Sequence, residues 1–226
     1  MKFEKVQAVL FDLDGTLIDS APDLGAAVDK MRVDRGMPSL PLSHYRPMAG
    51  AGARGMIGLA FGFTPDHPDY EVMKEEFFQN YEACMTQRTF AFEGVSQLIA
   101  ALVARHLPWG VVTNKHERFT HRIVERMAWL QRSATVICGD TTPHAKPHPA
   151  PLLHAAVAIG IPAGECIYVG DDLRDIQSAR AAGMPVLAAG FGYLGFGSQP
   201  SSWGADGVID SPLDTLNYLA RNPTMG

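Results

Sequence analysis

The residues best suited to chemistry in this chain are two aspartates that stand one residue apart near its start. Asp12 and Asp14 directly follow an apolar segment in the stretch AVLFDLDGTLIDSA. Burying an unpaired charge costs on the order of several kcal/mol or more. Two neighbouring carboxylates at the end of a buried strand therefore predict a cationic partner.

Further polar residues follow other apolar segments of the chain. Thr113 and Asn114 end one segment, Lys146 lies in a later loop, and Asp171 and Asp175 follow another segment. In open sheets of parallel strands, ligands bind outside the carboxyl ends of the strands. We therefore expect these side chains to meet at one edge of a sheet.

This set of side chains indicates a hard cation and an anionic substrate. Mg²⁺ is commonly held by one or two carboxylates together with substrate phosphate, which suits Asp12 and Asp171. The ammonium of Lys146 offsets the charge of a phosphate group, and the hydroxyl of Thr16 can hydrogen-bond its oxygens. A carboxylate can also attack phosphorus and form an aspartyl phosphate. The neighbouring Asp14 would then protonate the leaving alcohol and later activate a water.

The elements that must position these side chains are short strands alternating with helices. Helical patterns lie over residues 95–102 and 173–182. The alternation predicts an α/β fold, with a Rossmann-like doubly wound, mostly parallel sheet that helices cover on both faces. The five predicted strands are short and rich in Val and Ile: Val6–Phe11, Trp109–Thr113, Thr135–Cys138, Cys166–Gly170 and Pro185–Ala189.

The segment from Ser20 to Phe92 interrupts this alternation. Apolar residues recur at helical spacing over 24–31 and 70–81, and no strand is apparent. We expect an all-helical domain over residues 20–92, inserted into an α/β core domain made of residues 1–19 and 93–226. The glycine-rich stretch Gly50–Gly55 is expected to be a loop of this insert that faces the site.

The segments DLDGT, VVTNK, KPHP and GDDLRD, in this order, resemble the four motifs of the haloacid dehalogenase-like hydrolase superfamily. The resemblance implies that Asp12 is the nucleophile and Asp14 the general acid and base. It implies that Mg²⁺ is the cofactor, with Asp175 supporting the metal. The implied metal ligands are Asp12, the backbone carbonyl of Asp14, and Asp171; the implied phosphate-binding pair is Thr113 and Lys146; Thr16 and Asn114 are assigned to the substrate.

The helical insert resembles the C1-type cap of the phosphoglycolate phosphatase-like branch. The segments WGVVTNK, VGDDLRDI and WGAD further resemble bacterial N-acetylmuramic acid 6-phosphate phosphatases. The resemblance implies a phosphatase of cell wall recycling, acting on a small phosphate monoester: N-acetylmuramic acid 6-phosphate or 2-phosphoglycolate. Because both substrates carry a carboxylate, we expect a basic cap residue near the cleft. Arg54 is the candidate.

Three other functions use similar residues. A dehalogenase of this fold would use Asp12 but would need neither Asp14 nor the metal. A sugar phosphomutase would keep every motif, although such enzymes place Glu where this chain has Gly170. A phospho-receiver domain, a non-catalytic binding module, also uses acids, Mg²⁺, Thr and Lys, but lacks a long helical insert. The phosphomutase and the receiver stay open as alternatives.

The composition limits the partners of the chain. Its net charge is −5 and it has no basic block, which argues against a nucleic-acid partner. No apolar run approaches the roughly 20 residues that cross a bilayer, and we expect no membrane association. The cysteines Cys84, Cys138 and Cys166 form no CxxC pair, so we expect reduced thiols in a cytoplasmic protein. The oligomeric state is left open.

Overall fold

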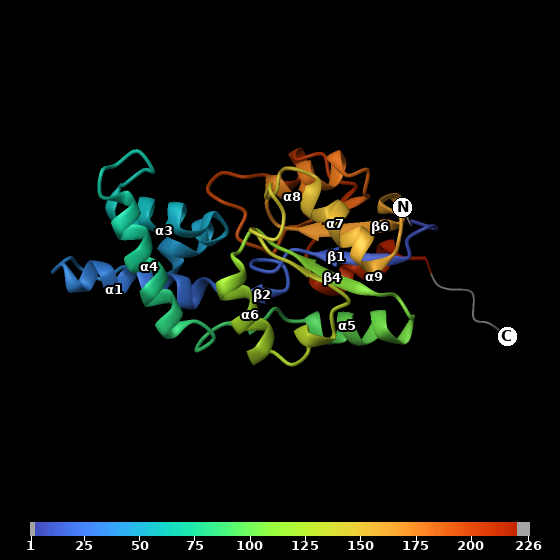
Figure 1. Cartoon of the computed structure of the whole chain (residues 1–226), viewed down its shortest axis with the longest axis horizontal. Coiled ribbons are helices and arrows are strands. Elements are labelled where there is room, and N and C mark those ends of the chain that lie inside the picture. Colours follow the sequence, from blue (N-terminus) through green and yellow to red (C-terminus); the bar gives the residue numbers. More distant parts are fainter. Residues whose placement is uncertain (1–2, 221–226) are drawn as a thin grey trace.

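A computed structural model describes residues 3–220, and its centre is a parallel sheet of six strands (Figure 1). The strand order is β5-β4-β1-β6-β7-β8. The predicted α/β fold with a parallel sheet is therefore confirmed. The strands of this sheet are β1 (Ala8–Phe11), β4 (Trp109–Val112), β5 (Val136–Ile137), β6 (Cys166–Gly170), β7 (Val186–Ala189) and β8 (Gly207–Ile209).

The alternation of side chains along the strands builds a core on each face of the sheet. In β1, Val9 and Phe11 belong to one apolar cluster, and Ala8 and Leu10 belong to the other. Successive side chains of a strand point to opposite faces, so four apolar residues in a row fit a strand that is covered on both sides. The sequence stretch AVLF therefore forms a fully buried strand.

Helices from the second part of the chain cover the two faces of the sheet (Figure 1). The first cluster receives side chains from α5 (Val95–Ala104) and α6 (Glu117–Arg126), and the second from α7 (Ala150–Ile159) and α8 (Leu173–Ala181). A short helix, α9 (Thr215–Tyr218), ends the described part of the chain. This arrangement presents the carboxyl ends of β1, β4 and β6 side by side at one edge.

The helices α1 to α4, here called the cap helices, pack together beside that edge (Figure 1). Their shared core includes Met31 and Phe77, both of which are buried. A 3₁₀ segment, Arg46–Ala51, leads into α3. The bounds of the cap helices are α1 (Ala21–Asp34), α2 (Leu42–Tyr45), α3 (Gly52–Phe61) and α4 (Tyr70–Cys84).

Two expectations about the insert are wrong. The segment from Ser20 to Phe92 does contain a strand: β3 (Phe90–Ala91) pairs antiparallel with β2 (Ile18–Asp19) where the chain leaves and re-enters the core. Two-residue strands are too short to give a periodic pattern. The stretch Gly50–Gly55 is also not a loop, because it spans the junction of the 3₁₀ segment and the first turn of α3.

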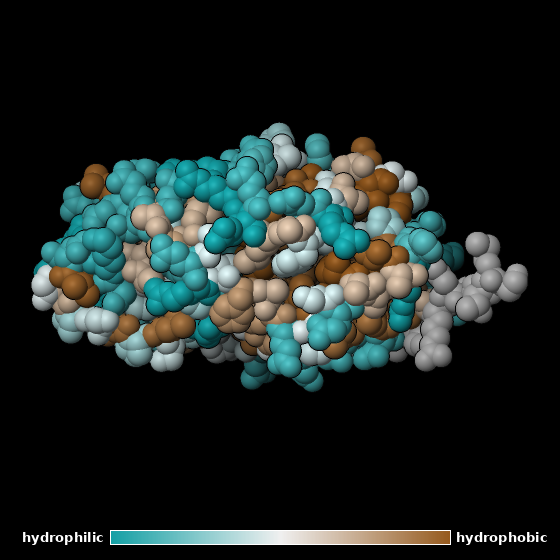
Figure 2. Space-filling view, turned by 90° about the horizontal axis from the view of Figure 1, so that it is seen from below, coloured by the Kyte–Doolittle hydropathy of each residue, from teal (hydrophilic) through white to brown (hydrophobic). Residues whose placement is uncertain are grey.

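The molecular surface differs between the two ends of the molecule. Figure 2 shows polar residues over much of the cap helices and more frequent apolar residues over the core. Within residues 3–220, the helices are too short or too polar to span a membrane.

Candidate active site

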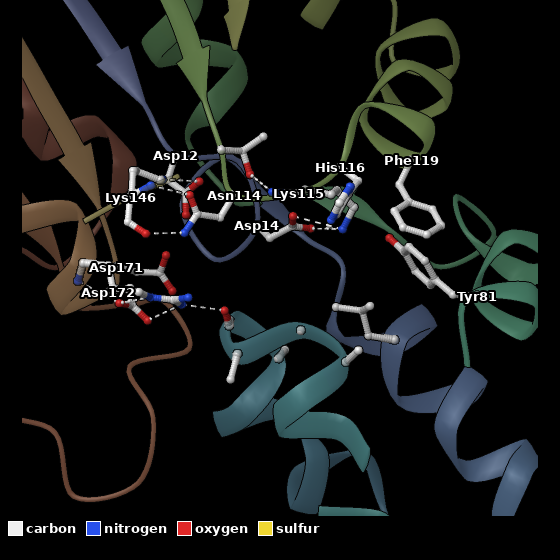
Figure 3. Close-up of a pocket in the computed structure, with 18 of the residues that line it drawn as sticks. Asp12, Asp14, Tyr81, Asn114, Lys115, His116, Phe119, Lys146, Asp171 and Asp172 are labelled. Atoms are coloured by element: carbon white, nitrogen blue, oxygen red, sulfur yellow. Dashed lines mark hydrogen bonds and ion pairs between the residues drawn. The ribbon is translucent and has the colours of Figure 1, made fainter. Parts of the chain in front are cut away.

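The acids predicted from separate strands meet at the carboxyl edge of the sheet. Asp12 follows β1, Asp171 follows β6, and Asp175 lies in the first turn of α8. One carboxylate oxygen from each of the three lies within 4.8 Å of the others. The ammonium of Lys146 enters this cluster, 3.0 Å from Asp12 Oδ1 and 2.7 Å from Asp175 Oδ1 (Figure 3). Three carboxylates therefore face a single lysine.

Burial and the excess of negative charge raise the pKa values of two of these acids. Burial raises the pKa of Asp12 to about 6, although the charge of Lys146 opposes the rise. Burial, together with the charges of Asp12 and Asp175, raises the pKa of Asp171 well above its usual value. Asp12 Oδ1 is buried and forms an ion pair with Lys146, but it accepts no hydrogen bond of good geometry from the described residues. The cluster thus fits an additional cation with oxygen ligands, as predicted for Mg²⁺.

Lys146 is held in place from several directions. Its Nζ donates to the carbonyl oxygen of Val112 at 2.9 Å and to the hydroxyl of Tyr168 at 2.7 Å. Its backbone exchanges two hydrogen bonds of 2.9 Å with the side-chain amide of Asn114. Asn114 lines the cavity described below, but its amide groups are engaged with Lys146. Its clearest role in the structure is therefore to position the lysine.

Two glycines allow the backbone to approach Asp171 closely. Gly15 has a φ of +86°, and a Cβ there would lie 2.1 Å from Asp171 Oδ2. A Cβ at Gly192 would lie 2.2 Å from the Cβ of Asp171. Asp171 also accepts hydrogen bonds from the backbone N–H of Tyr193 at 2.8 Å and from the hydroxyl of Thr16 at 3.1 Å. Thr16, expected at the substrate, thus supports Asp171 and does not line the cavity.

Asp14 lies next to the acid cluster but outside it. Its carboxylate accepts two bonds from Lys115 Nζ, at 3.0 and 3.1 Å, and a further bond from the hydroxyl of Ser20. Thr113 directly follows β4, and its hydroxyl accepts the backbone N–H of Lys115 at 3.1 Å. Both Asp14 and Thr113 line the cavity. Each predicted catalytic residue therefore faces the same space.

A cavity of about 250 Å³ lies between the core and the cap helices. Its core wall contains the acids, Lys146, Thr113 and Asn114. Its cap wall is mostly apolar. Residues 49–53 contribute a turn of alanines and glycines, and aromatic rings lie on the other side (Figure 3). The apolar and aromatic residues on that side are Leu24, Phe77, Phe78 and Tyr81 from the cap helices and Phe119 from α6 of the core.

The structure places Arg54 outside this cavity. Its side chain is exposed and lines a neighbouring hollow that also includes Gln177 and Leu194. The lysine and arginine side chains that line the main cavity in the described chain are Lys115, Lys146 and Arg174, all from the core. A substrate contact of Arg54 stays a prediction that this geometry does not favour.

Several residues that line the cavity are not identifiable from the sequence, and three of them, Lys115, Arg174 and Tyr81, have polar side chains that bear on the site. Lys115 follows Thr113 and Asn114 directly, and this position was its only signal. Arg174 lies inside the GDDLRD segment, and its guanidinium bonds both oxygens of Asp172 at 2.8 Å and the carbonyl oxygen of Gly50 at 2.8 Å. Tyr81 was interpreted as part of a buried helical stripe. It is buried, but it also lines the cavity.

Known proteins resemble this chain over most of its length. Residues 9–189 match the model of a family described as haloacid dehalogenase-like hydrolase. The chain is 39% identical over 221 residues to the N-acetylmuramic acid 6-phosphate phosphatase of Pseudomonas aeruginosa, covering 98% of each chain. It is 45% identical over 212 residues to a phosphoglycolate phosphatase of Xanthomonas campestris pv. campestris, covering 94% of this chain and 95% of the relative.

A solved structure shows the same fold. The crystal structure of a predicted phosphoglycolate phosphatase from Haemophilus somnus superposes with a TM-score of 0.83 at 24% identity, covering 95% of this chain and 98% of that one. Both of the relatives above are named phosphatases, so the prediction of a phosphatase is confirmed and the non-catalytic receiver is not supported. The motifs, the sheet and the family match agree: the chain belongs to the haloacid dehalogenase-like hydrolase family.

Proposed function

We propose that this chain is a Mg²⁺-dependent phosphomonoester hydrolase that works through an aspartyl phosphate on Asp12. The acid cluster supports the metal, because three carboxylates within 4.8 Å have one ammonium between them. Asp12, Asp171 and the backbone carbonyl of Asp14 would hold Mg²⁺, with Asp175 in support. When bound, Mg²⁺ would neutralise the acids and draw charge from the phosphate oxygens.

The first half-reaction transfers the phosphoryl group to the protein. An Asp12 carboxylate oxygen forms a bond to phosphorus while the bond from phosphorus to the ester oxygen breaks. Asp14 gives its proton to the departing ester oxygen. The ammonium of Lys146 and the hydroxyl of Thr113 contact the phosphoryl oxygens and stabilise their negative charge. The product alcohol then leaves.

The second half-reaction hydrolyses the aspartyl phosphate and restores the free carboxylate of Asp12. Asp14, now a carboxylate, takes a proton from a water whose oxygen attacks phosphorus, and the bond between phosphorus and Asp12 breaks. The position of Asp14 suits both steps, since it lines the same cavity as Asp12 without sharing the acid cluster. Its bonds to Lys115 and Ser20 hold the carboxylate in one orientation.

The apolar and aromatic lining of the cavity supports our choice of substrate. We propose N-acetylmuramic acid 6-phosphate in preference to phosphoglycolate. The leaving group of phosphoglycolate is a two-carbon anion with little apolar surface to place against Phe77, Phe78 and Phe119. An N-acetylated sugar acid offers methyl groups and the C–H faces of a ring, which aromatic side chains bury well. The residues 49–53, with few side-chain atoms, leave room for the ring.

The structure also bears on the phosphomutase alternative. A Cβ at Gly170 would lie 2.3 Å from Asp175 Oδ2, so a glutamate at this position would displace the acid that holds Lys146. A hydrolase is the better fit. The two-domain division, with residues 20–92 as the cap, and a cytoplasmic role in cell wall recycling belong to the same proposal.

A substrate panel with two controls tests this function. We expect kcat/KM for N-acetylmuramic acid 6-phosphate to equal or exceed that for phosphoglycolate, with activity lost in EDTA and restored by Mg²⁺. Asp12→Asn should lower turnover roughly 10³- to 10⁶-fold and leave no acid-stable phosphoenzyme. Full turnover in excess chelator would contradict the metal. A strong preference for phosphoglycolate would reverse the choice of substrate.

A further inference from the structure

The end of the cavity beyond Asp14 has an unusual polar pair. Lys115 reaches into the cavity from the end of β4, and Tyr81 faces it from α4 (Figure 3). Lys115 Nζ lies 3.0 Å from Asp14 Oδ2 and 4.9 Å from the centre of the Tyr81 ring. Both side chains are largely withdrawn from bulk solvent: the Lys115 side chain is 10% exposed and Tyr81 is 1% exposed.

The Tyr81 hydroxyl is buried and lies beside the ammonium of Lys115, but it makes no hydrogen bond of good geometry with the described residues. Buried polar groups in proteins are almost always hydrogen-bonded, so an exception needs an explanation. The hydroxyls of two other buried tyrosines follow the rule: Tyr45 donates to Asp29 at 2.8 Å, and Tyr168 donates to the carbonyl of Val112 at 2.7 Å. Lys115 can only donate to this hydroxyl, so the hydroxyl still lacks an acceptor for its own proton, and that acceptor belongs in the cavity that Tyr81 lines.

The cations of the cavity differ in how fully they are engaged. Lys146 is surrounded by two carboxylates, a carbonyl and a hydroxyl. Arg174 is engaged with both oxygens of Asp172 and with the carbonyl of Gly50. Lys115 pairs with a single carboxylate, that of Asp14, and its remaining neighbour in the cavity is Tyr81. Lys115 is therefore the lining cation with the most capacity for a further acceptor.

The ammonium of Lys115 and the hydroxyl of Tyr81 are both donors, so a group that binds to them must be a hydrogen-bond acceptor. Burial raises the pKa of Tyr81 to about 12, so at neutral pH the hydroxyl keeps its proton and can donate it. The rings of Phe77 and Phe119 pack against Tyr81 and make its surroundings apolar, which strengthens a charged hydrogen bond. One lysine of this protein already bridges two carboxylates, since Lys146 contacts both Asp12 and Asp175. An ammonium shared between Asp14 and a second carboxylate has the same form.

We propose that Lys115 and the Tyr81 hydroxyl together bind a carboxylate on the leaving group of the substrate. Asp14 lies between Lys115 and the cluster of Asp12 and Lys146 (Figure 3), so an anion on Lys115 sits beyond the ester oxygen that Asp14 protonates. The bound group thus belongs to the leaving alcohol and not to the phosphoryl group. This inference rests on the proposed phosphatase function and replaces Arg54 as the group that reads the carboxylate.

The test compares two esters that differ mainly by one carboxylate. N-acetylmuramic acid 6-phosphate carries a lactyl carboxylate, and N-acetylglucosamine 6-phosphate lacks it. Tyr81→Phe should lower kcat/KM for the first ester about 10-fold or more, chiefly by raising KM. For the second ester the loss in kcat/KM should be smaller by a factor of about 5 or more, because a hydrogen bond to a charged group is lost only with the first. Lys115→Gln should likewise lower kcat/KM more for the ester with the carboxylate than for the ester without it. Phosphoglycolate and ethyl phosphate provide a second pair.

Tyr45→Phe is the matched control, because it removes a bonded hydroxyl from the same group of helices at a residue that does not line the cavity. It should leave the substrate ratio unchanged. Tyr81→Phe should unfold at the same urea concentration as the wild type or a higher one, since it removes an unpaired buried hydroxyl. Equal losses on both esters of a pair would overturn the carboxylate site while leaving the phosphatase proposal standing. Absence of turnover on all four esters would overturn both.

Discussion

The replacement of Lys146 by methionine tests whether charge balance holds the acid cluster together. Methionine keeps an unbranched chain of similar length but removes the ammonium. In the wild type this ammonium contacts Asp12 and Asp175 and donates to Tyr168 and Val112. Tyr168 can still donate to Val112 in the variant. The carboxylates of the cluster therefore lose their common cation while the neutral groups stay paired.

The expected cost follows from how deeply the pair is buried. The side chains of Lys146 and Asp175 are 2% and 1% exposed. Removing one partner of a buried ion pair costs about 3–5 kcal/mol, because it leaves an uncompensated charge in place. We expect Lys146→Met to lower the free energy of unfolding by about that amount in EDTA. Mg²⁺ should restore a substantial part of the lost free energy of unfolding, because a bound divalent cation neutralises the carboxylates in place of the ammonium.

The assay is urea unfolding followed by circular dichroism, with EDTA or with Mg²⁺. Lys30→Met is the control: Lys30 is 58% exposed and pairs with Asp34, so its loss should cost at most about 1 kcal/mol. Adding Asp175→Asn to Lys146→Met should regain stability, since it removes one of the uncompensated charges. The reasoning fails if Lys146→Met stays within about 1 kcal/mol of the wild type in EDTA, or if Asp175→Asn only adds to its cost.

Three further predictions concern the acids and the backbone around them. Asp14→Asn should slow phosphoenzyme formation far less with an aryl phosphate than with an alkyl phosphate, because an aryl oxide needs little protonation; single-turnover rates that fall equally would contradict Asp14 as the acid. In EDTA, the free energy of unfolding should fall as the pH rises from about 4 through 6. The raised pKa values of Asp12 and Asp171 make the native state bind more protons than the unfolded chain over that range, and Mg²⁺ should abolish the fall. Gly15→Ala should weaken Mg²⁺ binding measured by calorimetry, because its methyl group meets Asp171; Gly36→Ala, with φ of +70° and open space around it, should show the backbone strain alone, about 1–2 kcal/mol.

The part of the site that was predictable lies at the ends of the strands. The rule that ligands bind at the carboxyl ends of parallel strands requires only the order of elements, and it predicts that Asp12, Lys146 and Asp171 lie together. The predicted bounds of β6, Cys166–Gly170, match the structure. The three-residue β8 was missed because Gly207–Ile209 is too short and too weakly apolar to form a pattern.

The unpredicted part depends on how the cap helices sit on the core. Tyr81 shares a helical stripe with Phe77, and periodicity correctly indicates that both are buried. Periodicity describes one helix, however, and the neighbour of Tyr81 across the cavity is Lys115 of the core. The expectation for Arg54 depends in the same way on the cap, because it assumes that the glycine-rich segment is a loop facing the site, whereas Gly52 begins α3.

The start of α8 shows that capping and chemistry need not be alternative explanations for an acid. Asp172 is the N-cap of this helix, and its backbone N–H donates to Asp175 Oδ2 at 3.0 Å, which completes a capping box. The other oxygen of Asp175 holds Lys146. Asp172 in turn orients Arg174, whose guanidinium reaches the carbonyl of Gly50 at the cap wall. One helix start therefore fixes the acid cluster, the lysine and a contact that closes the cavity, so that changes at Asp175 alter all three together.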